Sequence, residues 1–468
     1  MKKTKIVATI GPASDSFEMM CSLIDDGLDV MRLNFSHGSH AEHKIRIENM
    51  KKASHVKNKN IAILLDTKGP EIRTMSLIDS QEVALRANDT IILTIDKSHV
   101  GNYDKVAVTY EGLVNDLKQR DTILLDDGLI SLEVLDIIGD EIHCLIKNSG
   151  FLGENKGINL PNIQVNLPAL STKDIEDIKF GCDMNVDFIA ASFVRKASDV
   201  LALREELKKN DKPNIQIISK IENDEGIRNF ESILEASDGI MVARGDLGVE
   251  IPIEDVPFAQ KKMIEMCNKA GKIVITATQM LDSMIKNPRP TRAEAGDVVN
   301  AILDGTDAVM LSGETAKGKY PLEALKTMAK ICERTDYANF QASTPKHLSM
   351  SEVIASGTVR TADDIGASAI VILSESGTTA RNIKKLKPNA LVFAITTNKK
   401  TASQLSLARG VYSVIVDEIK DVKDFQKKAV EIVSKFDFIY NNDIIVLTSG
   451  TNTAIGITNL MKIEQIHK

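Results

Sequence analysis

The sequence of 468 residues predicts an α/β protein whose main unit is a (β/α)8 TIM barrel. Eight short apolar runs end in polar or charged residues, and amphipathic stretches separate most of them. Strands that alternate with helices in this way are typical of a parallel sheet closed into a barrel. The spacing of the runs fails once, which predicts an inserted domain, and a new strand–helix pattern after residue 345 predicts a second α/β unit.

The eight runs are nearly continuous in Val, Ile, Leu, Ala or Met, as strands buried on both faces should be. They are Thr4–Ile10, Val30–Phe35, Ile61–Asp66, Asp187–Ser192, Ile215–Glu222, Ile240–Asp246, Ile273–Thr278 and Ala308–Glu314. Two stretches between them, Phe17–Asp26 and Val256–Ala270, have helical spacing. The second follows Pro252, and its apolar residues are Phe258, Met263, Ile264 and Met266.

The interruption lies between Asp66 and Asp187, where about 120 residues replace an ordinary βα connection. Much of this insertion alternates apolar with polar residues: Thr90–Ile95, Lys105–Thr109, Thr122–Leu125, Leu129–Leu135 and Glu141–Ile146. Turn residues between the runs predict hairpins of a small β domain. An insertion after the third strand leaves from the C-terminal end of the barrel, where it is placed to act as a lid.

The second α/β unit is predicted to begin with a helix at Ser351–Ala362, after a linker at Gln341–Met350. Its strands are expected at Ala369–Ser374, Leu391–Thr396, Tyr412–Val416 and Ile444–Thr448. The domain boundaries that we expect are 1–69 and 172–345 for the barrel, 70–171 for the insertion and 346–468 for the last unit.

The composition excludes several classes of partner. Apolar residues make up 43% and charged residues 26% of the chain, which is ordinary for a globular protein. A net charge of -7 and the absence of Trp argue against a nucleic-acid or membrane-surface partner. Five widely spaced cysteines are typical of reduced thiols. With no apolar run of about 18 residues and no signal-peptide pattern at the start, we expect a cytoplasmic protein.

The strand ends carry the chemistry, because a barrel places its active site at the C-terminal ends of its strands. Lys220 and Glu222 are two residues apart, so they point to the same side of their strand, and Asp246 ends the next strand. Two carboxylates with a neighbouring cation suit Mg2+ or Mn2+ and an anionic substrate. The alternative is a structural ion pair inside the barrel mouth.

Other phosphate-binding patterns are weaker. The sequence has neither GxxxxGK[ST] nor GxGxxG. His37, His40 and His43 have metal-like spacing, but a polar helix start is the better interpretation of His40 and His43. Ser374–Arg381 follows a predicted strand and opens a helix, which fits either a phosphate cradle or a plain N-cap.

Taken together, these motifs resemble the pyruvate kinase family over almost the whole chain. The segments that carry the resemblance are Thr9–Pro12, Met31–Gly38, Leu65–Thr74, Ile218–Gly226, Met241–Pro252, Ile275–Met284, Arg289–Glu294 and Met310–Ala316. The resemblance is to bacterial, K+-dependent, allosteric members without an extra C-terminal domain. It implies a TIM barrel, an inserted small β-barrel lid domain and a C-terminal α/β regulatory domain.

The resemblance also implies an activity and its residues. The reaction would transfer the phosphoryl group of phosphoenolpyruvate to ADP, giving pyruvate and ATP, with Mg2+ (or Mn2+) and K+ as cofactors. The matched positions are Glu222 and Asp246 for Mg2+; Asn34, Ser36, Asp66 and Thr67 for K+; Arg32, Lys220, Gly245, Asp246 and Thr278 for phosphoenolpyruvate; and Asn34, Ser36, His37, Arg73 and Lys156 for the nucleotide. Lys220 would stabilise the transferring group, while Thr278, Ser312 or a water would relay the proton. Glu71 stands where K+-dependent members carry Glu.

Regulation and assembly are further implications of the resemblance. A sugar-phosphate effector would bind Ser374, Ser376, Gly377, Thr378 and Thr379. The facing loop, Gly450–Asn459, departs from the loop common in members activated by fructose 1,6-bisphosphate, so ribose 5-phosphate and AMP are competing effectors. A homotetramer is implied. Two rival functions stay open: a metal-dependent enolate lyase or aldolase on the same barrel, and a catalytically idle metabolite-binding protein.

Overall fold

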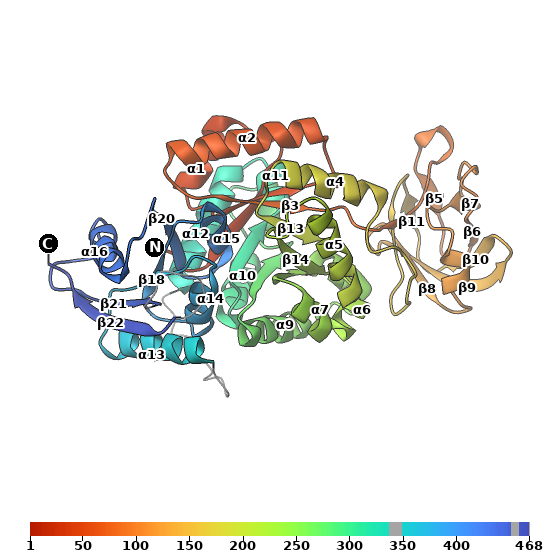
Figure 1. Ribbon diagram of the computed structural model, residues 1–468. Helices are drawn as coiled ribbons and strands as arrows, with labels where there is room; N and C mark the ends of the chain where they lie inside the picture. Colours follow the sequence, from red (N-terminus) through yellow and green to blue (C-terminus); the bar gives the residue numbers. More distant parts are fainter. Residues whose placement is uncertain (337–348, 451–457, 468) are drawn as a thin grey trace.

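The computed structural model describes residues 1–336, 349–450 and 458–467, and its centre is a closed parallel barrel (Figure 1). The strand order around the barrel is β1-β17-β16-β15-β14-β13-β3-β2. The strands span β1 Lys5–Thr9, β2 Val30–Asn34, β3 Ala62–Asp66, β13 Phe188–Ala191, β14 Gln216–Ile221, β15 Gly239–Ala243, β16 Ile273–Ala277 and β17 Ala308–Leu311. The predicted eight-stranded barrel is therefore confirmed.

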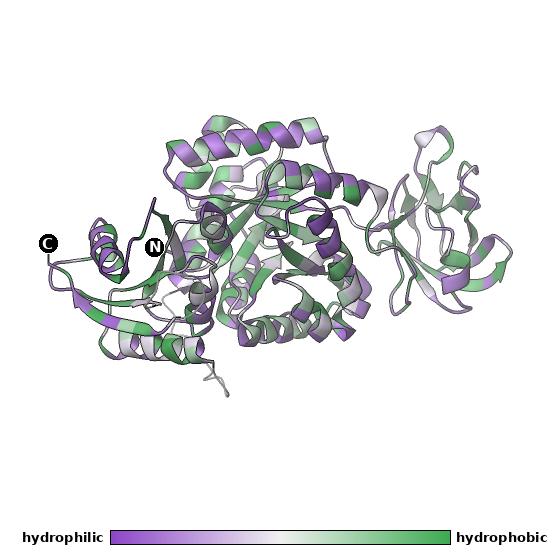
Figure 2. Ribbon diagram, viewed as in Figure 1, coloured by the Kyte–Doolittle hydropathy of each residue, from purple (hydrophilic) through white to green (hydrophobic). Residues whose placement is uncertain are grey.

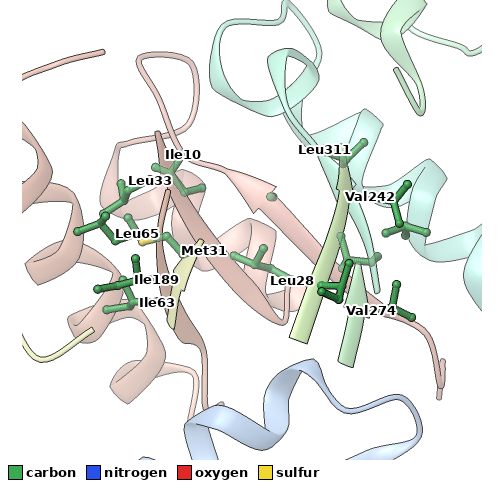
Figure 3. Close-up of a cluster of buried hydrophobic side chains, with 14 of the residues drawn as sticks. Ile10, Leu28, Met31, Leu33, Ile63, Leu65, Ile189, Val242, Val274 and Leu311 are labelled. Carbon is green, nitrogen blue, oxygen red and sulfur yellow. The ribbon is translucent and has the colours of Figure 1, made fainter. Parts of the chain in front are cut away.

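Helices surround the barrel because each strand is apolar on both faces. Along β3, Ile63 and Leu65 join a large buried cluster with helix residues such as Met20, whereas Ala62 and Leu64 join a second cluster made almost entirely of strand residues. The first cluster lies between strands and helices, as the close-up in Figure 3 shows, and the second fills the barrel interior. The helices are α1 Phe17–Asp25, α2 His40–Val56, α4 Thr172–Asp183, α5 Ala197–Lys209, α6 Asp224–Arg228, α7 Phe230–Ala236, α8 Arg244–Glu250, α9 Val256–Ala270, α10 Arg292–Asp304, α11 Gly313–Ala316 and α12 Pro321–Thr335.

One apolar residue of α9 is not part of the core. Phe258 is 72% exposed, whereas Met263 and Ile264 are buried. The buried residues of α9 recur at Val256, Gln260, Met263, Ile264 and Cys267, which is one helical face. Phe258 lies outside this face. Purple and green alternate along the outer helices in Figure 2, as in helices with one buried face.

The insertion forms a β domain at one end of the barrel, orange at the right of Figure 1. Its seven-stranded sheet has the order β4-β12-β8-β9-β10-β6-β7. An isolated bridge between Thr74 and Val108 joins the two outer strands and closes the sheet on itself. The strands are β4 Ile72–Arg73, β6 Thr90–Thr94, β7 Lys105–Ala107, β8 Thr122–Leu125, β9 Ile130–Ile138, β10 Glu141–Ile146 and β12 Gly157–Asn159, with β5 Val83–Leu85 and β11 Gly150–Leu152 paired separately.

The pairing inside this domain differs from the predicted hairpins at one place. β8, β9 and β10 form antiparallel hairpins across the Asp126-Asp127-Gly128 and Gly139-Asp140 turns. β6 and β7, however, run parallel. The ten residues between these two strands let the chain return to the same end of the sheet, which a short turn cannot do.

The last unit, blue at the left of Figure 1, is a five-stranded sheet of order β20-β19-β18-β21-β22. Four parallel strands, β18 Ala369–Leu373, β19 Leu391–Thr396, β20 Val411–Ile415 and β21 Ile444–Ser449, lie where the pattern predicts them, and α13 Met350–Asp364 begins the unit. β22 Leu460–Gln465 adds an antiparallel edge that the pattern did not predict. The remaining helices are α14 Thr378–Lys385, α15 Lys399–Gln404 and α16 Val422–Val433. Most of the predicted linker, residues 341–348, lies outside the described residues.

All five cysteines are free thiols, and four of them are buried. Among the described residues, no helix has the length and the apolar composition that crossing a membrane requires.

Candidate active site

The mouth of the barrel contains polar side chains because of the period of two along each strand. Leu64 and Ile218 fill the barrel interior, so Asp66 and Lys220, two residues further along, point the same way. The same step leads from Val30 to Arg32 on β2. The structure thus brings Arg32, Asp66 and Lys220 together at the C-terminal ends of three strands.

Lys220 is the centre of this cluster. Its Nζ lies 2.8 Å from Glu222 Oε1 and 3.2 Å from Asp66 Oδ1. It also donates a 2.8 Å hydrogen bond to Ser192 Oγ, which in turn donates to the carbonyl of Thr67 at 2.6 Å. The ammonium is therefore held at a fixed position by three elements.

Arg32 completes the cluster from the other side. Its Nε donates to Asp66 Oδ2 at 2.6 Å, and its Nη1 donates to Thr9 Oγ1 at 2.8 Å. Both oxygens of Asp66 are thus engaged, one by Arg32 and the other by Lys220. A third cation at Asp66 would have to share one of these oxygens.

The charges in the cluster depend on one another. Burial lowers the pKa of Lys220, but the carboxylates of Asp66 and Glu222 outweigh burial and raise the pKa above its ordinary value. Burial raises the pKa of Asp66, and Arg32 and Lys220 outweigh it, so that the net direction is downward. Burial raises the pKa of Glu222 to about 8 against the opposing effect of Lys220, and nearby Asp246 adds to the rise. The cluster therefore places the buried ammonium of Lys220 beside Glu222, whose negative charge is not fully stabilised by its neighbours.

Glu222 and Asp246 have the donor chemistry of a divalent-cation site. Glu222 Oε2 accepts from the backbone N–H of Phe193 at 2.6 Å, whereas buried Oε1 has no aligned hydrogen bond to any described residue, although Lys220 Nζ is near. Asp246 lies on α8, at the end of the neighbouring strand β15. No cluster of three or more His, Cys, Asp or Glu side chains within the described ranges is arranged to hold a metal. Two carboxylates alone suit an ion such as Mg2+ that keeps water ligands.

The end of β16 has an unusual backbone. Thr278 and Gln279 both have positive φ, at 65° and 53°, which is uncommon for two successive residues other than Gly. The guanidinium of Arg244 holds this turn by donating to the carbonyl of Thr278 at 2.8 Å. Thr278 Oγ1 accepts from the N–H of Gly245 at 2.7 Å. The turn therefore locks α8 to β16.

Ser312, at the end of β17, has a buried hydroxyl. Its Oγ has no hydrogen-bond partner in the part of the chain that the structure describes. Its backbone N–H donates to Glu314 Oε2 at 2.7 Å. Ser312 and Thr278 therefore differ: the hydroxyl of Thr278 is already engaged, and that of Ser312 is available.

The residues matched to K+ lie on neighbouring strand ends. Asn34 is in register with Asp66 across β2 and β3, and its Oδ1 accepts from the N–H of Ser36 at 3.1 Å. Thr67 Oγ1 accepts from the N–H of Ser192 at 3.2 Å. These are hard oxygen donors, as an alkali cation prefers. The carboxylate of Glu71 accepts from Arg73 Nε at 2.6 Å.

A cavity of about 330 Å³ lies between the lid and the barrel. Arg73, Asp127 and Lys156 line it from the lid, and Asp246 and Glu250 line it from the barrel. Arg73 Nη1 donates to the carbonyl of Asn155 at 2.6 Å, and Lys156 Nζ lies 3.0 Å from Asp126 Oδ1. Burial raises the pKa of Asp127, and Asp246 and Asp126 add to this rise. The cavity thus combines two lid cations with the predicted metal ligand Asp246.

Three other residues matched to the nucleotide lie elsewhere. Asn34 ends β2, Ser36 and His37 follow it, and none of the three is part of the lining of this cavity. His37 contributes its carbonyl, which lies 2.9 Å from His43 Nε2. His43 stacks on Phe35 and His40 lies 2.6 Å from Asp177, so both have structural contacts.

Comparison with known proteins identifies the chain's relatives. A family model described as pyruvate kinase, barrel domain, matches residues 1–325, and one described as pyruvate kinase, alpha/beta domain, matches residues 352–464. The chain belongs to the pyruvate kinase family. It is 50% identical over 471 residues to a pyruvate kinase of Bacillus licheniformis, covering 99% of this chain and 80% of that protein. It is 46% identical over 473 residues to a pyruvate kinase of Clostridium acetobutylicum, covering all of both chains.

A solved structure agrees with these relationships. The crystal structure of a pyruvate kinase from Cryptosporidium parvum superposes with a TM-score of 0.95 at 41% identity, covering 99% of this chain and 96% of that one. Membership of the pyruvate kinase family thus rests on both sequence and fold.

The residues matched to an effector in the pyruvate kinase resemblance surround the start of α14. Ser376 Oγ lies 3.0 Å from Thr378 Oγ1, and Gly377 has a φ of 77° at the N-cap position. Thr379 Oγ1 lies 2.7 Å from Thr458 Oγ1, which comes from the loop before β22. Ser374 Oγ is buried without a hydrogen-bond partner in the described ranges. Residues 451–457 of the facing loop lie outside the described residues.

Sequence reasoning missed several residues of this pyruvate kinase fold that the structure brings to the site. Ser192 binds Lys220 directly, and it is the last residue of the predicted fourth strand, whose end was not among those compared. The rule that polar strand ends form the site would have found it. Asn159 and Glu250 meet at 2.8 Å across the lid cavity, and nothing in the local sequence pattern distinguishes them.

Proposed function

We propose that the chain catalyses phosphoryl transfer from phosphoenolpyruvate to ADP, giving pyruvate and ATP, as the last step of glycolysis in the cytoplasm. The observation that carries this proposal is the buried ammonium of Lys220, fixed by Asp66, Glu222 and Ser192. It lies in the barrel mouth, and α8, which follows the next strand, carries Asp246, which borders the lid cavity. Phosphoryl transfer needs charge stabilisation at a fixed position more than it needs covalent chemistry.

Each residue of the mouth has a distinct part in this proposal. Arg32 and Lys220 bind the phosphate of phosphoenolpyruvate, and Lys220 stabilises the charge that spreads over the phosphoryl oxygens during transfer. Gly245 and Thr278 present a backbone edge to the substrate, and Asp246 lies beside them. The hydrogen bond from Gly245 to Thr278 holds this edge in place.

The cations would bind where the oxygen donors are. Glu222 and Asp246 would hold Mg2+ (or Mn2+), and Asn34, Ser36, Asp66 and Thr67 would hold K+. When bound, these ions neutralise negative charge on the phosphates. Glu222 Oε1, which lies 2.8 Å from Lys220 Nζ and has no aligned hydrogen bond within the described residues, supports the first site. Arg32 and Lys220 at both oxygens of Asp66 limit its share in the second.

The nucleotide would occupy the lid cavity. Arg73 and Lys156 are cations that acidic neighbours already orient, and both point into the same space as Asp246. Asn34, Ser36 and His37, on the barrel side, would approach the nucleotide from the mouth. This arrangement holds ADP between two domains, so that transfer requires both of them.

The enolate left after transfer must be protonated at carbon. Two hydroxyls, those of Thr278 and Ser312, are near the mouth. The buried hydroxyl of Ser312 has no partner within the described residues, whereas Thr278 Oγ1 already accepts from Gly245. We therefore favour Ser312 with a water as the proton relay.

The test is turnover coupled to lactate dehydrogenase, with phosphoenolpyruvate, ADP, Mg2+ and with or without K+. We expect ADP-dependent pyruvate formation, and we expect Lys220→Met to lose most of the turnover while its affinity for phosphoenolpyruvate stays close to that of the wild type. Pyruvate formation without ADP would indicate a lyase or aldolase instead. No turnover with all cations and effectors present would indicate a metabolite-binding protein.

Regulation and assembly complete the proposal. A sugar phosphate would bind at Ser374–Thr379, where the buried hydroxyl of Ser374 has no partner in the described chain and α14 begins. Titration of fructose 1,6-bisphosphate, ribose 5-phosphate and AMP at sub-saturating phosphoenolpyruvate tests this, and the absence of any activation would refute it. Sedimentation velocity tests the proposed homotetramer.

A further inference from the structure

The lid is connected to the barrel by two segments, and both are fixed on the barrel side of the connection. Asp174 of α4 is fully buried and accepts from the N–H of Gly69 at 2.9 Å and from the N–H of Ser171 at 2.8 Å. One carboxylate therefore holds Gly69, just before the lid, and Ser171, at the end of the lid.

The second connecting segment also bonds to Arg195 of the barrel. Buried Arg195 donates to the carbonyl of Val165 at 3.1 Å and to that of Leu167 at 2.8 Å. Asn166, between these two residues, instead bonds to Asp116 of the lid through its backbone N–H and its Nδ2, so this segment contacts both domains. Asn159 lies in β12 of the lid sheet and Leu160 packs in the core of the lid, so the contacts that these two residues make with the barrel depend on where the lid lies.

The lid touches the barrel on α8 through these two residues. Asn159 Nδ2 donates to Glu250 Oε1 at 2.8 Å, and the backbone amide of Leu160 faces the same carboxylate. A Cβ placed on Gly128, in the β8–β9 turn of the lid, would lie 3.4 Å from Val249 Cγ1 of α8. Burial raises the pKa of Glu250, opposed by its contacts with Asn159 and Leu160. The carboxylate is therefore enclosed between the two domains.

Helix α8 also carries the metal ligand that we propose. It has only seven residues, and Leu247 alone is buried. A helix this short has its position set by tertiary contacts and not by its own stability. Its first turn is held by Arg244, which binds Asp297 at 2.8 Å, and by the bond from Gly245 to Thr278. Its last turn is held by the lid, and Asp246 lies between the two, one helical turn before Glu250.

We propose that Glu250 is a positioning residue: its bond to Asn159 couples the closed position of the lid to the placement of α8 and hence of Asp246. When the lid opens, Glu250, in the last turn of α8, loses the hydrogen bond from Asn159. Lid closure then does two things at once, because it brings Arg73 and Lys156 to the cavity and fixes the helix that lines the opposite wall. This inference rests on the proposed phosphoryl transfer.

The test is a double-substitution cycle with Glu250→Ala, Asn159→Ala and the pair, in the full-length protein. We expect each single substitution to lower kcat/KM for ADP about tenfold, which is the size of one hydrogen bond to a charged group. The pair should be no worse than either single, because both act through the same bond. The KM for phosphoenolpyruvate should change by less than about threefold in all of them.

Two further variants and two further measurements separate positioning from a structural defect. Glu250→Gln keeps an acceptor oxygen for Asn159, so it should recover most of the activity. Glu254→Ala removes an exposed carboxylate four residues further along, outside α8, and should match the wild type. Hydrogen exchange of the segment 160–164 should be faster in Glu250→Ala, and Mn2+ titration followed by electron paramagnetic resonance should show weaker binding.

The proposal is overturned by any of three results: Glu250→Ala within twofold of the wild type, independent effects in the cycle, or Glu250→Gln no better than Glu250→Ala. An inactive wild type would instead refute the proposed phosphoryl transfer. Hydrogen exchange and Mn2+ binding would still decide the coupling, because neither needs turnover.

Discussion

The contact between the barrel and the C-terminal unit contains a buried ion pair whose removal should be costly. Lys384 of α14 lies with its Nζ 2.8 Å from Asp307 Oδ2, and the two side chains are only 4% and 2% exposed. Asp307 also accepts from the N–H of Val274 at 3.0 Å. Lys384→Met leaves this carboxylate buried without its cation. Removing one partner of a buried pair costs about 3–5 kcal/mol of unfolding free energy.

The matched control is the next residue. Lys385 lies 3.3 Å from Glu352, but both side chains are partly exposed, at 18% and 27%. Lys385→Met should therefore cost less than about 1 kcal/mol. Urea denaturation followed by circular dichroism measures both, with the midpoint compared at equal slope.

A second substitution shows whether the cost arises from the unpaired charge. Asp307→Asn removes the charge and keeps an acceptor for the N–H of Val274. Combined with Lys384→Met, it should recover part of the lost stability, so the two effects should not add. The reasoning is refuted if Lys384→Met costs no more than Lys385→Met, or if the double variant equals the sum of the singles.

Three other predictions follow from single contacts. Burial lowers the pKa of Lys5 from 10.5 to about 8. Between these two pH values the unfolded chain binds more protons than the folded chain, so the free energy of unfolding should rise with pH. The urea midpoints of Lys5→Met should lack this rise. Ser192→Ala removes a hydrogen bond from Lys220 and should lower kcat about tenfold in the coupled assay, with little change in the KM for ADP. Gly69 and Gly139 both have positive φ, but a Cβ on Gly69 would lie 2.8 Å from that of Ser192, whereas a Cβ on Gly139 would meet nothing within 4 Å. The melting temperature should therefore fall more in Gly69→Ala than in Gly139→Ala. Equal falls would contradict the steric argument.

The long elements could be predicted from sequence because burial determines them directly. Strands such as Val30–Asn34 are enclosed on both faces, so their apolar runs are continuous and their ends are marked by polar residues. Strands of two or three residues, such as Ile72–Arg73, have no periodicity to read. β22 was missed for a different reason: it is an edge strand with exposed Met461 and Ile463, and its place depends on pairing with β21.

The residues of the site likewise fall into those that the sequence could predict and those that it could not. Lys220, Glu222 and Asp246 follow strand ends, where the period of two and the barrel topology place them. The contact of Asn159 with Glu250 joins residues 91 positions apart on two domains, so no local pattern could pair them. Phe258 shows the limit in a helix: an apolar residue within an amphipathic stretch was exposed because it falls outside the buried face.

The difference between the mouth and the lid has a consequence for how substitutions act. The mouth is a buried network in which Arg32, Asp66 and Lys220 hold one another without any contact from the lid cations Arg73 and Lys156. The lid cations Arg73 and Lys156 are about one-third exposed and are paired with acids of their own domain, Glu71 and Asp126. Closure therefore moves ion pairs that are already formed and needs no new ones. Substitutions in the mouth should accordingly lower kcat, whereas those in the lid should raise the KM for ADP, because in the proposed function the lid cations bind the nucleotide.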